Sequence, residues 1–134
     1  MKSVKQKVGQ VGEDLASKFL ESKGYRILDR NYRKKWGEID IIAEKDDIVH
    51  FIEVKANSVS STFAKASADK RETYMPEDNV RLWKKQRLSR AIRTYLLDKK
   101  IGDEQEFQID VLAVFLDFGL KKAKFRLVEN VLLH

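Results

Sequence analysis

Residues 37–55 have the sequence GEIDIIAEKDDIVHFIEVK, and this stretch decides how the chain can fold. Two apolar runs typical of buried β-strands flank the charged sequence EKDD at 44–47, which predicts a turn between two strands. Asp40 interrupts the first run, and Glu53 and Lys55 interrupt the second. Burying a bare charge is costly unless it is paired, neutralised or bound to a cation. These three residues therefore need a chemical explanation.

Successive side chains of a strand point to opposite faces of the sheet. Asp40 and Glu53 lie on adjacent predicted strands, so their carboxylates can approach each other and will repel unless a proton or cation lies between them. A hard divalent ion, Mg²⁺ or Mn²⁺, resolves this repulsion, and the main-chain carbonyl of Val54 offers it a further oxygen ligand. The alternation predicts two sets of residues, each on one face of its strand: Glu38, Asp40 and Ile42, and then Phe51, Glu53 and Lys55.

Lys55 follows Glu53 by two residues and should emerge on the same side of the strand. An ammonium there can stabilise developing negative charge or orient a water, while the metal lowers the pKa of that water. This assembly suits hydrolysis of a phosphodiester. The alternative for Asp40, Glu53 and Lys55 is a structural salt bridge. We expect Glu38 to be a turn or surface residue and His50 to be a surface histidine.

The rest of the chain predicts two helices and three more strands in a single domain spanning residues 1–134. Apolar residues at helical spacing follow Val4, and Gly24 supplies the helix stop. Residues 57–78 are small, polar and charged, and we predict a long mobile loop or insertion there. The fold class is α/β, in the order αβββαββ. The remaining elements are strand 25–33, helix 79–99, strand 107–118 and a short strand within 124–131.

The net charge is +6, which favours polyanionic partners. Two basic clusters flank the acidic motif and point to a phosphate backbone, although a solvated helix face is the alternative. On a helical wheel, Lys84 and Lys85 point toward the buried stripe of helix 79–99, whereas Gln86 and Arg87 point away and can meet solvent or nucleic acid. The clusters are Arg26, Arg30, Arg33, Lys34 and Lys35, and then Arg81, Lys84, Lys85, Arg87, Arg90 and Arg93.

The composition excludes several classes of protein. The chain has no cysteine, which rules out disulfides, zinc–thiolate sites and thiol nucleophiles. Two histidines leave little material for a histidine-based triad. No apolar segment is long enough to span a membrane or to follow the basic N-terminus as a secretory signal. We therefore expect a cytoplasmic protein without a membrane partner.

The pattern GEID followed by FIEVK resembles the PD-(D/E)xK nuclease motif, and most of the chain outside residues 58–75 is similar to the YraN-like family. That family is uncharacterised, has a restriction-endonuclease-like fold, and is related to archaeal Holliday-junction resolvases. The ordered set of motifs is specific, whereas ExK alone is common. The segments that carry the resemblance are GQVGEDLASKFLESKGYRILDRNYR, GEIDIIAE, FIEVKANS, PEDNVRLWKKQRLSRAIRTYL, FQIDVLAV and VENV.

The resemblance implies roles for individual residues. Asp40 and Glu53 become metal-binding acids and Lys55 the catalytic lysine. Glu13, which lies on the flank of the first helix and is otherwise a solvated carboxylate, becomes an additional acid. Lys84 becomes the helix lysine, with Lys85 as the adjacent alternative. Family members often have Thr-Arg after EVK, where this chain has Ala56-Asn57, and this departure removes one expected phosphate contact.

The sequence thus predicts a restriction-endonuclease-like α/β domain with a central mixed five-stranded sheet flanked by helices. We expect a nucleic-acid-binding protein, with DNA as partner ahead of RNA, and a Mg²⁺- or Mn²⁺-dependent endonuclease with branched DNA among its candidate substrates. The alternative is a non-catalytic nucleic-acid-binding module that keeps the fold. Dimerisation stays open. The expected nucleic-acid contacts are Arg33, Lys34, Lys35, Lys85, Gln86, Arg87 and Arg90.

Overall fold

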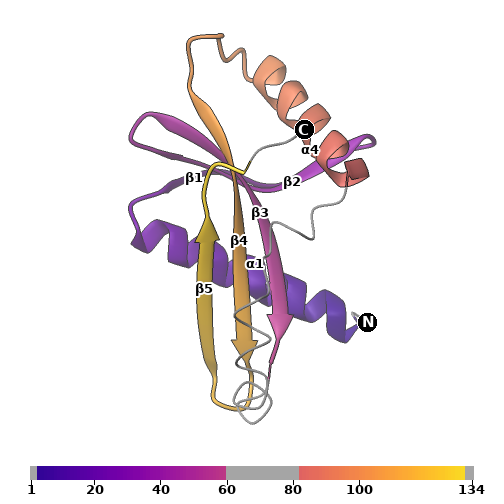
Figure 1. Ribbon diagram of the computed structural model, residues 1–134, viewed down its shortest axis with the longest axis vertical. Helices are drawn as coiled ribbons and strands as arrows, with labels where there is room; N and C mark the ends of the chain where they lie inside the picture. The colour runs from indigo at the N-terminus through magenta and orange to yellow at the C-terminus, as the bar shows by residue number, and fades with distance from the viewer. Residues whose placement is uncertain (1–2, 60–81, 132–134) are drawn as a thin grey trace.

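The computed structural model describes residues 3–59 and 82–131, which form one sheet and two helices (Figure 1). The α/β fold and the order αβββαββ agree with the prediction. The strand order is β1-β2-β3-β4-β5, with β3 and β4 parallel and the other neighbours antiparallel, so the sheet is mixed. The elements are α1 (Val4–Ser22), β1 (Arg26–Lys34), β2 (Gly37–Lys45), β3 (Ile48–Ser58), α4 (Leu82–Asp98), β4 (Phe107–Asp117) and β5 (Lys122–Val128).

Helix α1 begins and ends at residues suited to these positions. The Ser3 hydroxyl accepts the Gln6 N–H, and the Gln6 side chain accepts the Ser3 N–H, which together form a capping box. Gly24 has a φ of +92° just beyond the last turn, a conformation that glycine adopts without strain. The predicted stop at Gly24 is confirmed.

The turn between β2 and β3 consists of Asp46 and Asp47, whose φ values are +52° and +64°. Two central residues with positive φ are the mark of a type I′ hairpin turn, whose twist matches that of the flanking strands. Aspartate tolerates this conformation better than most residues. The predicted turn at EKDD is therefore confirmed, and it sets the register of β2 against β3.

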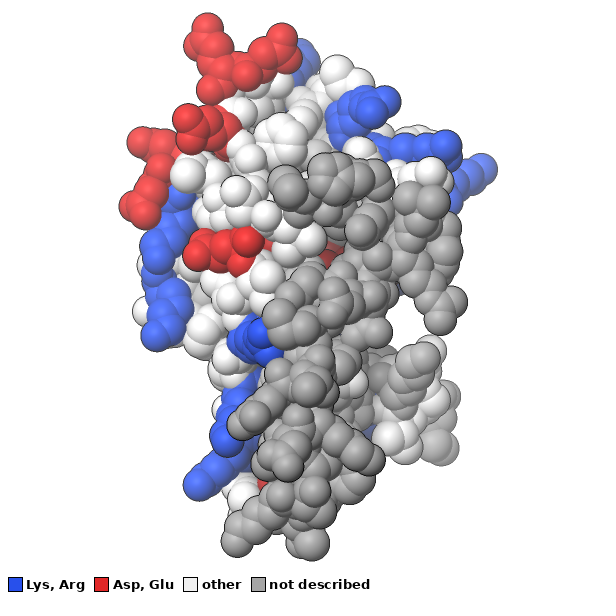
Figure 2. All heavy atoms as spheres, in the orientation of Figure 1, with Lys and Arg blue, Asp and Glu red and all other residues white. Residues whose placement is uncertain are grey.

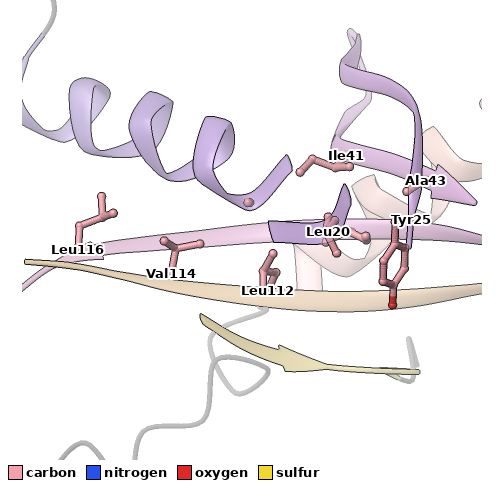
Figure 3. Packing of buried hydrophobic residues seen from close by; sticks show 9 residues of the cluster. Leu20, Tyr25, Ile41, Ala43, Leu112, Val114 and Leu116 are labelled. Carbon is pink, nitrogen blue, oxygen red and sulfur yellow. The ribbon is translucent and has the colours of Figure 1, made fainter. Parts of the chain in front are cut away.

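The two helices cover opposite faces of the sheet, and each has its own apolar core. Under α1, the side chains of Leu112, Val114 and Leu116 in β4 point toward the helix (Figure 3). Under α4, Ile39, Phe51 and other apolar residues pack against Leu88, Ala91, Ile92 and Tyr95. Neither described helix combines the length and apolar composition that crossing a membrane requires.

Helix α1 packs unusually close to β3 at Gly12. A Cβ atom added at Gly12 would collide with the Cβ of Ala56. Both residues are small, so the helix backbone can approach the strand. This contact fixes α1 against the part of β3 that carries the acidic motif.

Two predicted features differ from the structure, and others lie outside the described residues. Ile39 and Ile42 both pack under α4, whereas Ile41 packs under α1, so the strict alternation predicted for β2 is wrong. The predicted loop begins too early, because β3 continues through Ser58. Residues 60–78 of that loop and residues 79–81 of the predicted helix lie outside the described residues.

Candidate active site at the divergence of β2 and β3

Strands β2 and β3 pair over only part of their lengths. Their register extends from the pair Lys45–Ile48 to the pair Ile41–Ile52. Beyond this point β2 stays with β1, and β3 continues beside β4 to Ser58. Figure 1 shows β1 and β2 running across the view while β3, β4 and β5 run down it. The sheet therefore splits next to Asp40 and Glu53.

The Asp40 carboxylate lies in this gap. Its Oδ2 accepts the main-chain N–H of Val54 at 2.8 Å, taking the place that a carbonyl of a paired strand would have. The N–H and C=O of one strand residue point toward the same neighbouring strand. The Val54 carbonyl is accordingly directed into the same gap, where a metal-ligand role was predicted for it.

Glu53 and Lys55 lie on the face of β3 that carries Phe51. Phe51 packs under α4, whereas Ile52 and Val54 pack under α1, and alternation places Glu53 and Lys55 with Phe51. Lys55 Nζ is 3.7 Å from Glu53 Oε1. The Glu53 side chain is 7% exposed and that of Lys55 22%, so the ion pair is largely shielded from water. The predicted common face for these residues is confirmed.

The three groups converge on one short segment of β3. The amide that binds Asp40 belongs to Val54, which separates Glu53 from Lys55 in the chain. The cluster offers carboxylate oxygens, a main-chain carbonyl and one ammonium. This oxygen-rich donor set matches the preference of Mg²⁺ and Mn²⁺.

Glu13 occupies a different environment, on the α1 side of the sheet. It lines a polar cavity of about 700 Å³ with Arg30, Asn31 and Arg33. Burial raises the pKa of Glu13, and a hydrogen bond with Asn31 and the charges of Arg30 and Arg33 oppose that rise. The structure thus joins Glu13 to Asn31 and to the arginines of β1.

The two predicted basic clusters meet in space. The β1–β2 hairpin carries Arg33, Lys34 and Lys35 and contacts the last turns of α4, where Lys34 Nζ is 3.5 Å from Asp98. Trp36 Nε1 donates to Thr94 Oγ1 at 2.9 Å. Residues that are far apart in sequence therefore form one surface beside α4.

The predicted contacts on α4 are partly described. Gln86, Arg87 and Arg90 are exposed, which confirms that Gln86 and Arg87 point away from the core. Lys84 and Lys85 belong to the helix, but their side chains lie outside the described residues. Figure 2 shows basic side chains gathered at the upper right and along the left edge of the molecule, and acidic ones concentrated at the upper left.

His50 is the clearest error of the sequence prediction. It is buried, with 4% of its surface exposed, and its Nδ1 lies 2.7 Å from Oδ2 of Asp110. Asp110 is fully buried and also accepts hydrogen bonds from Gln108 Nε2 and the Asn130 N–H, each at 2.9 Å. The sequence signal that could have indicated this pair is Asp110, a carboxylate among the apolar residues of FQIDVLAVFLDF.

An α/β domain of order αβββαββ, with two acids and a lysine where two strands diverge, is the arrangement implied for a restriction-endonuclease-like protein. The chain belongs to the uncharacterised protein family UPF0102, whose model matches residues 12–114, and this confirms the YraN-like resemblance.

Relatives of nearly the same length support this membership. A UPF0102 protein of Campylobacter hominis is 37% identical over 125 residues, which cover 93% of both chains. One from Alkaliphilus oremlandii is 41% identical over 125 residues, covering 92% of this chain and 96% of its own. One from Clostridium perfringens is 38% identical over 127 residues, covering 95% and 93%.

Proposed function

We propose that this protein binds nucleic acid and is a Mg²⁺-dependent endonuclease that hydrolyses phosphodiester bonds. The observation that carries the proposal is the hydrogen bond from the Val54 N–H to Asp40 Oδ2. It holds one acid of the motif against the segment that carries the other acid and the lysine. An ordinary salt bridge between strands would not require the sheet to split at this point.

Asp40, Glu53 and the Val54 carbonyl would hold the metal ion. All three offer hard oxygen ligands, and Glu53 is a largely buried carboxylate whose charge a divalent cation would compensate. A bound Mg²⁺ would stabilise negative charge on the phosphate and lower the pKa of the attacking water. The hydrogen bond from the Val54 N–H to Oδ2 would keep the Asp40 carboxylate beside the other members of this set.

Lys55 would act on the substrate. Its ammonium is close to Glu53 but partly accessible, so it can contact a phosphate oxygen without leaving the face of β3. In a shielded site, a fixed positive charge next to the phosphate stabilises the charge that develops during hydrolysis. Lys55 is therefore expected to affect turnover more than substrate affinity.

The basic surface beside α4 would bind the substrate backbone. Lys35, Arg87 and Arg90 are exposed there, and the chain carries a net charge of +6. Phosphate contacts of this kind give affinity without reading sequence. DNA is the first substrate class to test, including branched forms.

The test is Mn²⁺- or Mg²⁺-dependent cleavage of duplex, single-stranded and branched DNA, with RNA as a comparison. Asp40→Asn and Lys55→Ala should each lower the cleavage rate on the order of 10²-fold or more. Asp103→Asn and Lys18→Ala change an exposed acid and an exposed lysine elsewhere and should cleave like the wild type. Equal rates for all five proteins would refute the enzymatic proposal.

The alternative outcome is a nucleic-acid-binding module without turnover. It predicts salt-sensitive DNA binding by the wild type and both site variants, with no product at any metal concentration. Calorimetric titration with Mg²⁺ or Mn²⁺ separates both functions from a purely structural ion pair. If the ion pair is purely structural, Asp40→Asn would lower the free energy of unfolding, and neither the wild type nor Asp40→Asn would bind Mg²⁺ or Mn²⁺.

A further inference from the structure

We infer a second metal site, built from His50, Asp110 and Glu129, that takes a divalent transition-metal ion such as Zn²⁺. The three residues come from β3, β4 and the segment just after β5. One potential ligand atom from each lies within 4.8 Å of the others. The strands thus bring together an imidazole and two carboxylates that are far apart in sequence.

The geometry around Asp110 leaves one oxygen for the ion. Asp110 Oδ1 accepts hydrogen bonds from Gln108 Nε2 and the Asn130 N–H, whereas Oδ2 faces His50 Nδ1 at 2.7 Å. An ion bound here takes the place of the hydrogen between Nδ1 and Oδ2. The neutral imidazole then keeps its proton on Nε2. Asp110 can bind the ion without rotating, because Oδ2 already faces His50 while Oδ1 keeps its two hydrogen bonds.

The third ligand can move to complete the site. Ligand atoms around a tetrahedral Zn²⁺ lie about 3.3 Å apart, given bond lengths of about 2.0–2.1 Å. The 2.7 Å contact between His50 and Asp110 must therefore widen slightly, and Glu129 must move inward. Glu129 is exposed, so its side chain can do so at little packing cost.

The electrostatic field at this point favours a cation. Two carboxylates converge on one imidazole, and like charges this close repel unless a cation or proton separates them. Tyr25 is a neighbour of this cluster, because its side chain shares a hydrogen bond with Glu129. The Tyr25 ring also packs edge-on against His50, with ring centroids 5.0 Å apart.

This site is separate from the one at Asp40 and Glu53. His50 precedes Glu53 by three residues, a distance of about 10 Å along a strand. His50 has the strand parity of Ile52, which packs under α1, and so lies on the opposite face from Glu53. The donor chemistry also differs, since an imidazole nitrogen favours Zn²⁺ and related ions over Mg²⁺.

A bound ion would fasten the C-terminal segment to the sheet. Asn130 N–H already binds Asp110, and the Val131 N–H donates to the Ile109 carbonyl at 2.7 Å. Glu129 would add a metal bond from the same segment to β3 and β4. The ion would therefore stabilise the folded state, since binding to the folded state alone raises the free energy of unfolding.

The test is calorimetric titration with Zn²⁺ in an Asp40→Asn background, which removes an acid of the first site and needs no nuclease activity. The added variants are Glu129→Gln, His50→Asn and the control Glu104→Gln, an exposed acid elsewhere. Asparagine can still donate to Asp110 from an amide near the position of Nδ1, so His50→Asn should fold.

We expect one Zn²⁺ per chain in the background protein, unchanged affinity in Glu104→Gln, and at least about tenfold weaker binding in Glu129→Gln and His50→Asn. If His50→Asn fails to fold, Glu129→Gln decides the question, because Glu129 is exposed. Equal affinity for Glu129→Gln and Glu104→Gln, or no Zn²⁺ binding by the folded background protein, would overturn the inference.

Discussion

Gly37 lies directly beneath the main-chain carbonyl of Arg87, so closely that a Cβ atom on Gly37 would overlap the carbonyl oxygen. The first residue of β2 is therefore one of the points where α4 touches the sheet. Ala91, one turn further along α4, contacts the same point. The glycine of the GEID motif thus has a packing role, and it fixes the strand that carries Asp40 relative to α4.

Gly37→Ala is expected to lower the free energy of unfolding by about 1–3 kcal/mol, because main chain would have to move away from main chain. Urea denaturation measures the change. Gly102→Ala is the matched control, since nothing lies within 4 Å of a Cβ at Gly102, and it should be neutral or slightly stabilising. Similar unfolding curves for the two variants would show that α4 does not press on β2.

Glu13 should make stability depend on pH. Burial raises its pKa in the folded state, so the folded protein holds this proton to higher pH than the unfolded chain does. The contribution of Glu13 to the free energy of unfolding is fully present below its pKa in the unfolded chain. It is lost as the pH rises through its pKa in the folded protein. Relative to wild type, Glu13→Gln should therefore gain stability as the pH increases from about 4 toward 7.

Urea denaturation of wild type and Glu13→Gln between about pH 4 and pH 7 measures the difference in their free energies of unfolding. Asp14→Asn is the neighbouring control, because Asp14 is exposed and forms a 2.7 Å ion pair with Arg30. Removing this exposed pair should cost no more than about 1 kcal/mol. The difference in free energy of unfolding between wild type and Glu13→Gln should change with pH as described. A difference that is constant with pH, or that changes in the opposite direction, would contradict the expected burial effect.

The surface beside α4 should make DNA binding sensitive to salt. We plot the logarithm of the binding constant against the logarithm of the salt concentration. If Lys35 and Arg90 each contact one phosphate, replacing either by alanine makes the slope of this plot less steep by about 0.9 for duplex DNA. Fluorescence anisotropy at several salt concentrations gives this slope. Lys18→Ala removes an exposed lysine of α1, on the other face of the sheet, and should leave it unchanged. A slope that stays at the wild-type value in both Lys35→Ala and Arg90→Ala would place the binding surface elsewhere.

Local sequence patterns were enough to predict much of the fold. The apolar runs on either side of EKDD gave the two strands, and the paired aspartates at the turn have the backbone conformation that joins them. The alternation in β3 correctly placed Glu53 and Lys55 together. These features depend on neighbours in the chain, which a period of two residues describes well.

The features that were not predicted depend on contacts between distant residues. Whether His50 is buried is decided by Asp110, sixty positions away, and by Tyr25, which packs against its ring. The break of alternation in β2 accompanies a positive φ at Asn31 in the neighbouring strand, which the sequence of β2 does not contain. The parallel pairing of β3 with β4 likewise brings together residues that no local pattern relates.

The early end of the β2–β3 ladder has a mechanical consequence. Beyond the Ile41–Ile52 pair, β2 is paired with β1 and β3 with β4, so Asp40 and Glu53 lie on strands with different neighbours. The hydrogen bond from the Val54 N–H to Asp40 Oδ2 spans the opening between these strands. A small change in the angle at which the two strands diverge would therefore alter the spacing of the acids without breaking any strand pairing.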